Sequence, residues 1–477
     1  MKNFLLLLLC FSLILCTFVS CDKTGGGASE TTANAEASNN TDIATTEAAT
    51  TATEAPAADL PLYVGYAREN ISPTQFPCGM DGNTKATYVN DDLYATAVAF
   101  SDGKTKTVVV TLDVVYISTS MYDAIIKDIV AKTSLPKENI YIHSTHNHSS
   151  PNYVLAEQST DTAVKKWRTD VIAKVPTAVK NAIDDLKSAE IYIGSVYTNG
   201  LNFVRKSAYN QATDTQLQAM RFVRDGAKDV VLANWQAHPA SSVNTGAITA
   251  DYVGEFRRIV EEENDVYFAY FNGANGNLNV NIRGTYANSL EGVNSVGVAL
   301  AAKFNTLLQS KNIMKKASTG EIKVASTICA VDVAPVDADM KAKVLELYSQ
   351  NNVNNASAQS IGLESVYVLR ALKERIDLTS SGNSTQDIEL WALSFGDVAF
   401  AFAPYEMFDD NGVQIKSGSP YKMTFICTVS GGGNNGYIPS EIEFGKNIYE
   451  VLVCLYSKGT GERLANSLIS TLTEMKK

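Results

Sequence analysis

Short apolar runs recur along the chain from Leu60 onward, and turn-forming or charged residues separate them. Runs of this length that are rich in β-branched and aromatic residues predict strands. Three pairs of runs flank short turns containing Asp and Gly, which is typical of β-hairpins. The predicted strands cover residues 60–72, 93–100, 107–116, 140–143, 190–197, 217–223, 230–235 and 266–271, the hairpin 388–402, and residues 422–429.

Longer segments between these strands place apolar residues at helical spacing, which predicts amphipathic helices. Pro176 falls inside one of them and is expected to kink or divide it. Hairpins combined with crossover helices indicate an α/β or α+β fold, in which helices flank a mixed β-sheet. The predicted helices cover residues 118–133, 163–186, 250–263, 294–309, 338–350, 363–373 and 461–475.

The start of the chain has Lys2 followed by an almost wholly apolar run, which predicts a secretory signal peptide over residues 1–20. A transmembrane anchor is the alternative, because the run approaches the length that spans a bilayer. The phrase FVSC at residues 18–21 resembles a bacterial lipobox, in which Cys21 becomes the lipidated N-terminus. We therefore expect an exported protein of a bacterial cell envelope, held on the outer face of the membrane by lipid chains on Cys21.

After Cys21 the sequence is rich in Gly, Ala, Ser, Thr and Glu up to about Asp59. Such a segment lacks the apolar surface that would offset its ordering entropy, so residues 21–58 are predicted to be a disordered tether. Its typical reach would be roughly 30–35 Å. Residues 59–477 have the composition of globular proteins and are predicted to form a single catalytic domain.

Charge and cysteine content limit the partners and the covalent framework. The formal net charge of −11 argues against nucleic acid as a partner, because phosphate binding needs clustered cations. Four cysteines follow Cys21 without CxxC spacing, and they are compatible with buried free thiols or with one disulfide of unassigned partners. They are Cys78, Cys329, Cys427 and Cys454.

Histidine is rare and clustered. Three of the four histidines in the chain lie in YIHSTHNHSSPN, residues 141–152, where a predicted strand ends and a loop begins. Alternate residues of an extended segment point to the same side, so His146 and His148 are expected to face one site. Loop histidines hydrogen-bonded at the surface are the alternative. His143, inside the strand, is expected to be structural.

Three further residues follow or interrupt apolar strands. His238, in the phrase WQAHP, is either a site residue or a histidine satisfied within the core. Glu406 would be costly to bury without a cation, unless it is a carboxylate at a helix N-terminus. Asp113 lies inside VVVTLDVVYIS and is expected to be buried and paired. Each of these signals is weak by itself.

Several common catalytic and nucleotide motifs are missing from the sequence. The loop NGANGN, residues 272–277, has neither GxGxxG spacing nor a P-loop Lys-Ser/Thr, which argues against a nucleotide site. The chain also contains no GxSxG nucleophile elbow and no HExxH helix. Tyr437 and Tyr449, twelve positions apart, are by themselves as compatible with packing as with chemistry.

Taken together, nine phrases resemble one family, the neutral (alkaline, non-lysosomal) ceramidases, from about Tyr63 to Glu450. STHNHSSP stands in place of a THTHSGP-like phrase, and NFVRKS stands in place of an NRS-like phrase. The nine in order are VGYARENISP, LDVV, STHNHSSP, NFVRKS, AHP, ITADYVGEF, AYFNGANGNLN, APYE and NGYIPSEIEFGKNIYE.

The resemblance implies a zinc-dependent amidohydrolase that cleaves the N-acyl amide bond of a small amphiphilic, ceramide-like lipid. Two histidines, a carboxylate and a phenolate are reasonable zinc ligands, and an open position for water would remain. His148 would act as general acid or base. Two other residues would stabilise an oxyanion or hold a substrate hydroxyl. By this resemblance the zinc ligands are His146, His238, Glu406 and Tyr437, and the substrate or transition-state contacts are His148, Arg205 and Tyr449.

The chain also departs from the family. Gly273 stands where the resembling phrase has a serine, and Asn277 stands where it has an aspartate, so a serine-dependent step is not expected at that place. The family's C-terminal sandwich-like domain is expected to be missing. Two alternatives follow: a zinc enzyme acting on a different amide or ester, and a catalytically inert binding lipoprotein tethered at the surface.

Overall fold

The computed structural model describes residues 60–80, 84–152, 160–205, 213–242, 245–282, 289–433 and 436–477. The predicted signal peptide, the lipidated Cys21 and the predicted tether therefore lie outside the described residues. The elements below belong to one compact unit of the chain. The mixed α/β fold expected from the sequence is confirmed.

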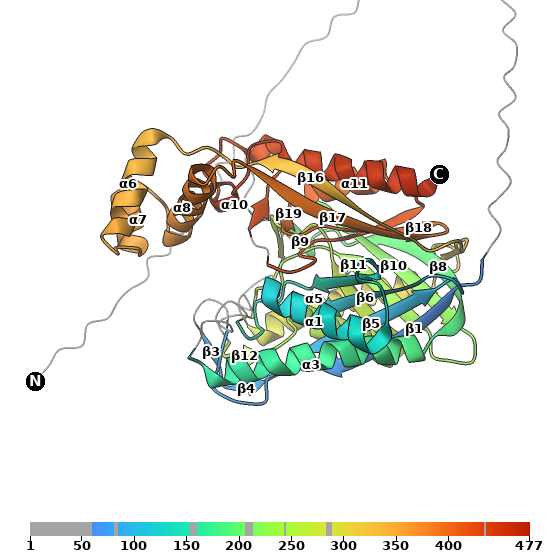
Figure 1. Cartoon of the computed structure of the whole chain (residues 1–477). Helices are drawn as coiled ribbons and strands as arrows, with labels where there is room; N and C mark the ends of the chain where they lie inside the picture. The colour runs from blue at the N-terminus through green and yellow to red at the C-terminus, as the bar shows by residue number, and fades with distance from the viewer. Residues whose placement is uncertain are drawn as a thin grey trace, which may run out of the picture. The chain divides into compact units, whose positions relative to one another are not determined.

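The main sheet has two four-stranded halves (Figure 1). They join where Tyr63 and Val64 pair with Ser188 and Lys187. A short strand, β15 (Lys315–Lys316), adds to the second half. The first half consists of β1 (Tyr63–Asn70), β5 (Tyr94–Ser101), β6 (Lys106–Leu112) and β7 (Ile140–Ser144). The second half consists of β8 (Lys187–Tyr197), β10 (Gln216–Arg224), β11 (Val230–Trp235) and β13 (Tyr267–Asn272).

The outer edges of the two halves also meet. The backbone N–H of Asn272, at the end of β13, donates to His143 Nε2 on β7 at 3.0 Å. The hydroxyl of Thr111 on β6 donates to the carbonyl of Tyr270 on β13 at 2.8 Å. The sheet is therefore bent enough to bring its two end strands, β13 and β7, together. As a result, the loops that follow β7, β11 and β13 open toward one another.

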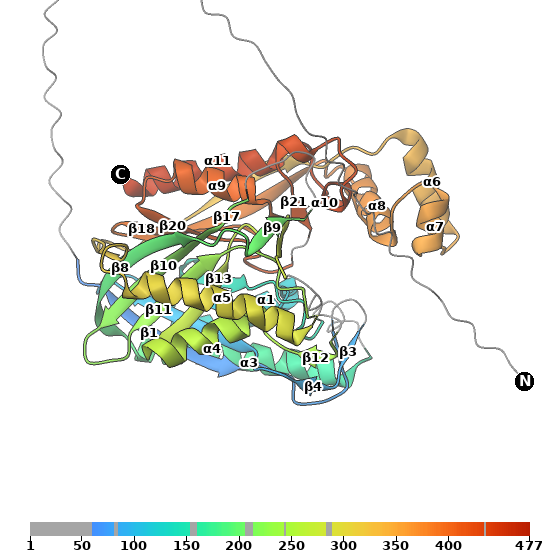
Figure 2. The same cartoon turned by 180° about the vertical axis from the view of Figure 1, so that it is seen from behind.

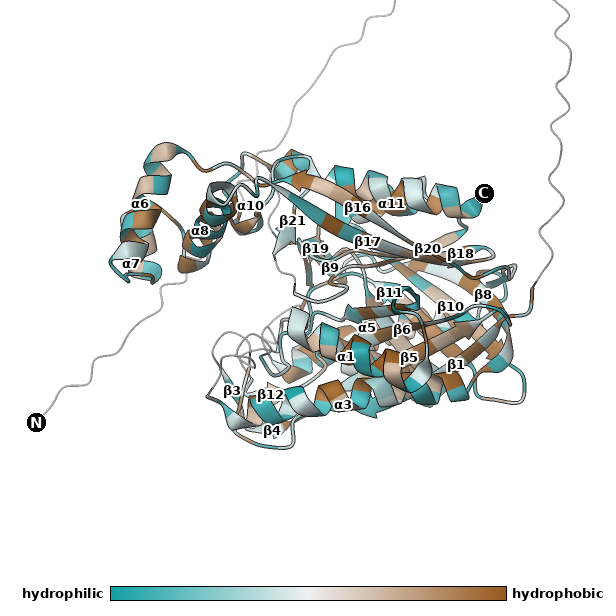
Figure 3. Cartoon of the chain, viewed as in Figure 1, coloured by the Kyte–Doolittle hydropathy of each residue, from teal (hydrophilic) through white to brown (hydrophobic). Residues whose placement is uncertain are grey.

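Pairs of helices cover each half of the main sheet (Figures 1 and 2). Their apolar faces and the sheet enclose two cores, the first including Ile125, Trp167 and Val175, the second including Phe256 and Phe304. Figure 3 shows hydrophobic and hydrophilic residues alternating along α3, as expected for a helix with one buried face. The pairs are α1 (Thr119–Thr133) with α3 (Thr162–Asp184), and α4 (Tyr252–Asn264) with α5 (Leu290–Gln309).

A second sheet, in the order β16-β17-β18-β20, packs on the remaining face of the main sheet. The core between the two sheets contains an aromatic group in which Phe100 lies 5.0 Å from Phe395 and 5.5 Å from Phe222, measured between ring centroids. The strands are β16 (Lys323–Asp332), β17 (Thr385–Phe395), β18 (Val398–Phe402) and β20 (Met423–Cys427), and the helices α9 (Asp409–Gly418) and α11 (Thr460–Lys476) pack on them.

A small helical lobe has a core of its own that includes Val344, Leu369 and Ile376 (Figure 1). It consists of α6 (Ala338–Ser349), α7 (Asn355–Ser360), α8 (Val366–Ser380) and α10 (Tyr449–Val453). The short elements are β2 (Cys78–Gly79), β3 (Lys85–Ala86), β4 (Tyr88–Val89), β9 (Asn202–Val204), β12 (Ala247–Ile248), β14 (Leu278–Val280), β19 (Glu406–Met407), β21 (Tyr437–Ile438), η2 (Lys137–Asn139) and η4 (Glu441–Glu443).

Three details differ from the sequence-based expectation or were left open by it. Pro176 lies inside α3, which continues through it as one helix, so of the two expected effects, a kink or a division, the division does not occur. Asp251, inside the predicted helix 250–263, is the N-cap of α4, which begins at Tyr252. Cys78, Cys329, Cys427 and Cys454 are buried free thiols. In the part of the chain that the structure describes, no helix has the length and apolarity needed to cross a bilayer.

Candidate metal centre

The loop after β7 holds His146 in a fixed, unusual backbone conformation. Residues on both sides of it donate to the neighbouring chain, Thr145 N–H to Leu112 O at 2.9 Å and Asn147 N–H to Val114 O at 3.0 Å. His146 itself has φ of 66°, in the left-handed region that residues with a Cβ rarely adopt. Strain of this kind persists where the surroundings enforce it, and it is common at functional sites.

His238 reaches the same place from the loop after β11. Its backbone N–H donates to Leu278 O at 2.9 Å, and Pro239 O accepts from the backbone N–H of His148 at 3.0 Å. The two histidine loops are thus hydrogen-bonded to each other. His146 and His238 are both buried.

Glu406 and Tyr437 lie in a separate two-stranded sheet, beyond strands of the second sheet. They follow β18 and β20 and face each other as paired residues of the parallel strands β19 and β21. Gly276 packs directly against this pair, and its N–H donates to Met407 O at 2.8 Å. A Cβ at Gly276 would lie 2.9 Å from the carbonyl carbon of Glu406, so this close approach requires glycine.

Four side chains converge between the two sheets. Glu406 Oε2 lies 3.2 Å from His146 Nε2 and 2.9 Å from His238 Nε2. His148 Nε2 lies 3.2 Å from His146 Nε2. The ligand atoms of the three histidines all lie within 4.8 Å of one another. Zinc ligands held at about 2.1 Å in a tetrahedron are separated by about 3.4 Å, so the residues present fit a zinc ion.

The hydrogen bonds behind the imidazoles determine which nitrogen faces the centre. His146 Nδ1 lies 3.0 Å from Val115 O, and His238 Nδ1 lies 2.8 Å from Asn275 O. A carbonyl only accepts, so each Nδ1 carries a proton, and in the neutral imidazole Nε2 then presents a lone pair. Two lone pairs therefore point at a carboxylate, an arrangement that is unfavourable unless a cation lies between them.

Burial and neighbouring charges shift the pKa values of the groups at this centre. Burial and the nearby Arg205 lower the pKa of His238 to about 3, so its imidazole is neutral. Burial raises the pKa of Glu406, whereas a positive charge or a donated proton from the facing imidazoles outweighs burial and lowers this pKa well below the ordinary value, so the carboxylate is ionised. Burial and Glu406 raise the pKa of Tyr437 well above its ordinary value, so without a cation its phenol keeps its proton.

The three predicted contact residues border the same centre. Arg205, just after β9, forms an ion pair with Glu450 at 2.7 Å and donates to Gly276 O at 2.7 Å. Its guanidinium lies 5.4 Å from the centroid of the Tyr437 ring. Tyr449 begins α10, and its ring centroid lies 6.0 Å from that of Tyr437. The structure thus brings all seven predicted site residues together, whereas their individual roles stay predictions.

Sequence reasoning missed two residues of the centre. Glu450 holds Arg205, and its position directly after Tyr449 gave no separate signal. Gly276 permits the contact with Glu406, and its place in a loop after a strand was read only as evidence against a nucleotide site. Asp113 is buried and paired as expected, with Arg257 NH1 at 2.8 Å.

The two replaced positions have structural counterparts. A Cβ at Gly273 would lie 2.8 Å from Gln236 Oε1 and 3.0 Å from Gln236 Cβ, so Gln236 occupies the space that a larger residue would need. Asn277 exchanges hydrogen bonds with Asp409: its Nδ2 donates to Asp409 Oδ1 at 2.7 Å, and its Oδ1 accepts from the Asp409 N–H at 3.0 Å.

Comparisons with known proteins support the resemblance. Residues 64–293 match the family model "Neutral/alkaline non-lysosomal ceramidase, N-terminal". The fold is similar to that of neutral ceramidase from Pseudomonas aeruginosa, with a TM-score of 0.68, 15% identity, and coverage of 87% of this chain and 75% of that chain. A second solved structure, "Ceramidase complexed with C2", gives a TM-score of 0.69 and 15% identity over 88% of this chain and 76% of that chain.

No curated protein matches the chain in sequence. At 15% identity, the solved structures show the fold. The resemblance to the neutral ceramidases is confirmed by the family match over residues 64–293 and by this fold.

Proposed function

We propose that the protein is a zinc-dependent hydrolase of the ceramidase type, cleaving the N-acyl amide bond of a small amphiphilic, ceramide-like lipid. The family match of residues 64–293 and the shared fold support a ceramidase-like hydrolase. The nitrogen and oxygen donor set at the centre supports zinc.

One observation carries the proposal: the Nε2 atoms of two buried imidazoles, whose Nδ1 atoms already face carbonyls, lie against the buried carboxylate of Glu406. Without a cation this contact sets electron-rich atoms against one another. A cation held at this place would remove that repulsion, with His146, His238, Glu406 and Tyr437 as its ligands. His148 lies at the less buried side of this group, where a substrate would enter.

A bound zinc ion would supply a Lewis acid that polarises a carbonyl and activates water. His148 would transfer a proton to the nitrogen of the leaving amine. Burial raises the pKa of Tyr449 to about 12, so its phenol stays protonated near neutral pH and donates to the carbonyl oxygen as negative charge develops. Arg205, fixed by Glu450, adds positive charge beside this oxygen or holds a substrate hydroxyl.

The test measures bound metal in the purified protein and its hydrolysis of a fluorogenic N-acyl-sphingosine. We expect zinc in the wild-type protein, and we expect His146→Ala to lose both zinc and activity. His143→Gln is the matched control, because this histidine lies outside the ligand group and the variant should keep both. Folded wild-type protein without zinc, and an active His146→Ala variant, would refute the proposal.

A second candidate keeps zinc but changes the substrate to another amide or ester. It is favoured by Gln236, which occupies the space beside Gly273. Hydrolysis of a panel of acyl amides and esters without hydrolysis of ceramide would support this candidate. Tight zinc binding without turnover of any of these compounds would instead indicate an inert binding protein.

Attachment to a membrane through Cys21 is a separate proposal, resting on the phrase FVSC and the apolar run before it. Mass spectrometry of the mature protein is expected to find an acylated N-terminal cysteine. Cys21→Ser is expected to release the protein from the membrane fraction. An unmodified cysteine in mature protein would refute the proposal.

A further inference from the structure

Asn147, between His146 and His148, is fully buried and satisfies its side-chain amide within the protein. Its Nδ2 donates to Thr249 O at 2.8 Å and to Asp113 O at 3.3 Å. Its Oδ1 accepts from the backbone N–H of Ser149 at 3.0 Å. The side chain thus fixes the backbone on both sides of His148 to two other parts of the fold.

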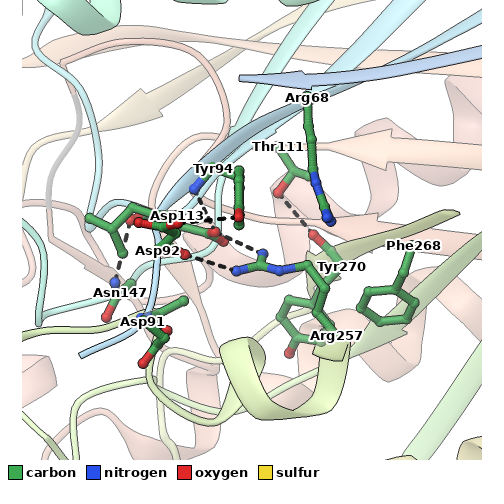
Figure 4. A network of polar contacts seen from close by, with 12 residues as sticks. Arg68, Asp91, Asp92, Tyr94, Thr111, Asp113, Asn147, Arg257, Phe268 and Tyr270 are labelled. Atoms are coloured by element: carbon green, nitrogen blue, oxygen red, sulfur yellow. Dashed lines mark hydrogen bonds and ion pairs between the residues drawn. The ribbon is translucent and has the colours of Figure 1, made fainter. Parts of the chain in front are cut away.

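The first of these parts is anchored by a buried ion pair (Figure 4). Asp113 follows β6, and its Oδ2 accepts from Arg257 NH1 at 2.8 Å and from the Tyr94 N–H at 2.9 Å. Arg257 belongs to α4, and its guanidinium lies 4.8 Å from the centroid of the Tyr94 ring. The carbonyl that Asn147 uses is therefore held by β5 and α4 as well as by β6.

The second part is the loop that leads into α4. The Thr249 hydroxyl donates to Asp91 Oδ2, and the Ala250 N–H donates to Asp91 Oδ1 at 2.8 Å. The Thr249 N–H also donates to Ser149 O at 3.3 Å. The Asn147 side chain therefore bonds to both of these parts. In the sequence, Asn147 stands between His146 and His148.

We propose that Asn147 is a positioning residue, which sets the separation and direction of the His146 and His148 imidazoles and thereby the metal affinity of the centre. This inference rests on the metal-binding part of the proposed function. An amide suits the role because Nδ2 has two protons for two separate carbonyls. The threonine in the resembling phrase THTHSGP has one hydroxyl proton and serves one carbonyl at a time.

A matched control is available in Asn234. It is fully buried, its Nδ2 donates to Phe271 O and Ile426 O at 2.8 Å each, and its Oδ1 accepts from the Ile426 N–H at 3.1 Å. Asn234 therefore makes the same kinds of hydrogen bond as Asn147, but it joins β11 to β13 and β20. Replacement of either residue removes equivalent interactions, and Asn147 alone adjoins the histidines.

The experiment compares Asn147→Leu with Asn234→Leu in the full-length protein, measuring zinc affinity by competition with a chromophoric chelator. We expect Asn147→Leu to bind zinc about 10–100-fold more weakly, the usual effect of losing a residue that orients ligands, and Asn234→Leu to change affinity less than about threefold. The visible spectrum of the Co²⁺-substituted protein should change only for Asn147→Leu. If the leucine variants do not fold, Asn147→Thr and Asn234→Thr take their place.

Equal zinc affinities for the two variants, or an Asn147 variant with wild-type affinity and spectrum, would overturn the inference. Hydrolysis by the wild-type protein is assayed separately. Zinc-loaded wild-type protein without turnover would contradict the proposed reaction and leave this inference intact. An active wild-type protein whose Asn147 variant binds zinc normally would contradict this inference alone.

Discussion

While His146 and His238 are neutral with their protons on Nδ1, Glu406 faces two unprotonated Nε2 atoms and accepts no hydrogen bond from them. Glu406→Gln would place an amide N–H against a lone pair of His146 or His238. We expect this change to raise the free energy of unfolding of the metal-free protein by about 1 kcal/mol, the value of one hydrogen bond. Urea unfolding in the presence of a chelator measures it.

The same variant should lose stabilisation by metal. Zinc at 100 times its dissociation constant raises the free energy of unfolding of a one-site protein by about 2.7 kcal/mol. We expect this increase for the wild-type protein and little of it for Glu406→Gln. If Glu406→Gln is less stable than the wild type in chelator, the Glu406 carboxylate is not repelled by the two imidazole nitrogens.

The contact between Asn277 and Asp409 should affect how the free energy of unfolding depends on pH, because the pKa of Asp409 is raised. Burial raises the pKa of Asp409 to about 6, above its ordinary value of 3.8, so the stability that this group contributes is lost as pH rises from 3.8 to 6. Asn277→Asp would replace a donor with a second carboxylate 2.7 Å away. We expect a loss of about 1–3 kcal/mol at pH 8 and a smaller loss at pH 5, where the pair shares a proton.

Urea unfolding at the two pH values tests this expectation. An equal loss at pH 5 and pH 8 would mean that the variant acts through packing and not through charge. The result also tests why an asparagine suits position 277. Its amide side chain can donate to the carboxylate of Asp409 and accept from the N–H of Asp409.

At the scale of elements, His143 joins the first and last strands of the bent sheet. Burial lowers its pKa from 6.5 to about 3, and its unprotonated Nε2 accepts from the Asn272 N–H. The stability contributed by this neutral imidazole is complete above pH 6.5 and is lost as pH falls toward 3, because the unfolded chain binds the proton first.

His143→Gln keeps an acceptor and removes the titration. We expect the free energy of unfolding of the metal-free variant to fall less steeply between pH 6 and pH 4, by up to about 1.4 kcal/mol per pH unit. Urea unfolding of both proteins in chelator gives the two slopes. Parallel slopes would mean that the edges of the sheet do not depend on a neutral His143.

Gly276 links two further elements, the loop after β13 and strand β19. Gly276→Ala would force β19 away, and we expect it to cost about 1–3 kcal/mol and to weaken zinc binding. Gly103→Ala is the control, since a Cβ there meets nothing within 4 Å and only its φ of 91° resists the change. A Gly276→Ala variant with unchanged zinc affinity would separate this contact from the metal centre.

Most helices and hairpins follow from local patterns, because turn chemistry and periodicity act over a few residues. Strand β16 was not predicted, because apolar residues fall on both of its faces: Ile328 is exposed, whereas Cys329 and Val331 are buried. Helix α7 is too short to show periodicity. Pro176 did not divide α3, whose buried side includes Val171, Val175 and Val179 against the sheet.

For the whole molecule, the sequence predicted that site residues follow strands, but it did not predict how these strand ends meet. Convergence depends on the bend that joins β7 to β13 and on the packing of the second sheet. Neither has a local pattern, because both arise from contacts between residues far apart in the chain. The family resemblance alone connected His146 and His238 with Glu406 and Tyr437.

Because the ligand candidates follow strands of both sheets, a bound metal should connect the two sheets. We expect a chelator to increase amide hydrogen exchange at residues 144–150 and at residues 403–408 in parallel. The α6 helix should not change, because it packs within the separate core of the helical lobe. Faster exchange in one sheet alone would show that metal is held by that sheet without the other.

The ligand candidates follow strands of two sheets that are far apart in the sequence, and this has a consequence for biosynthesis. His146 and His238 are made first, and Glu406 and Tyr437 are made later. A nascent chain has imidazoles without the carboxylate and the phenol that complete the centre. We therefore expect zinc to bind only after β19 and β21 have been made, and we expect a truncated chain that lacks these strands not to bind it.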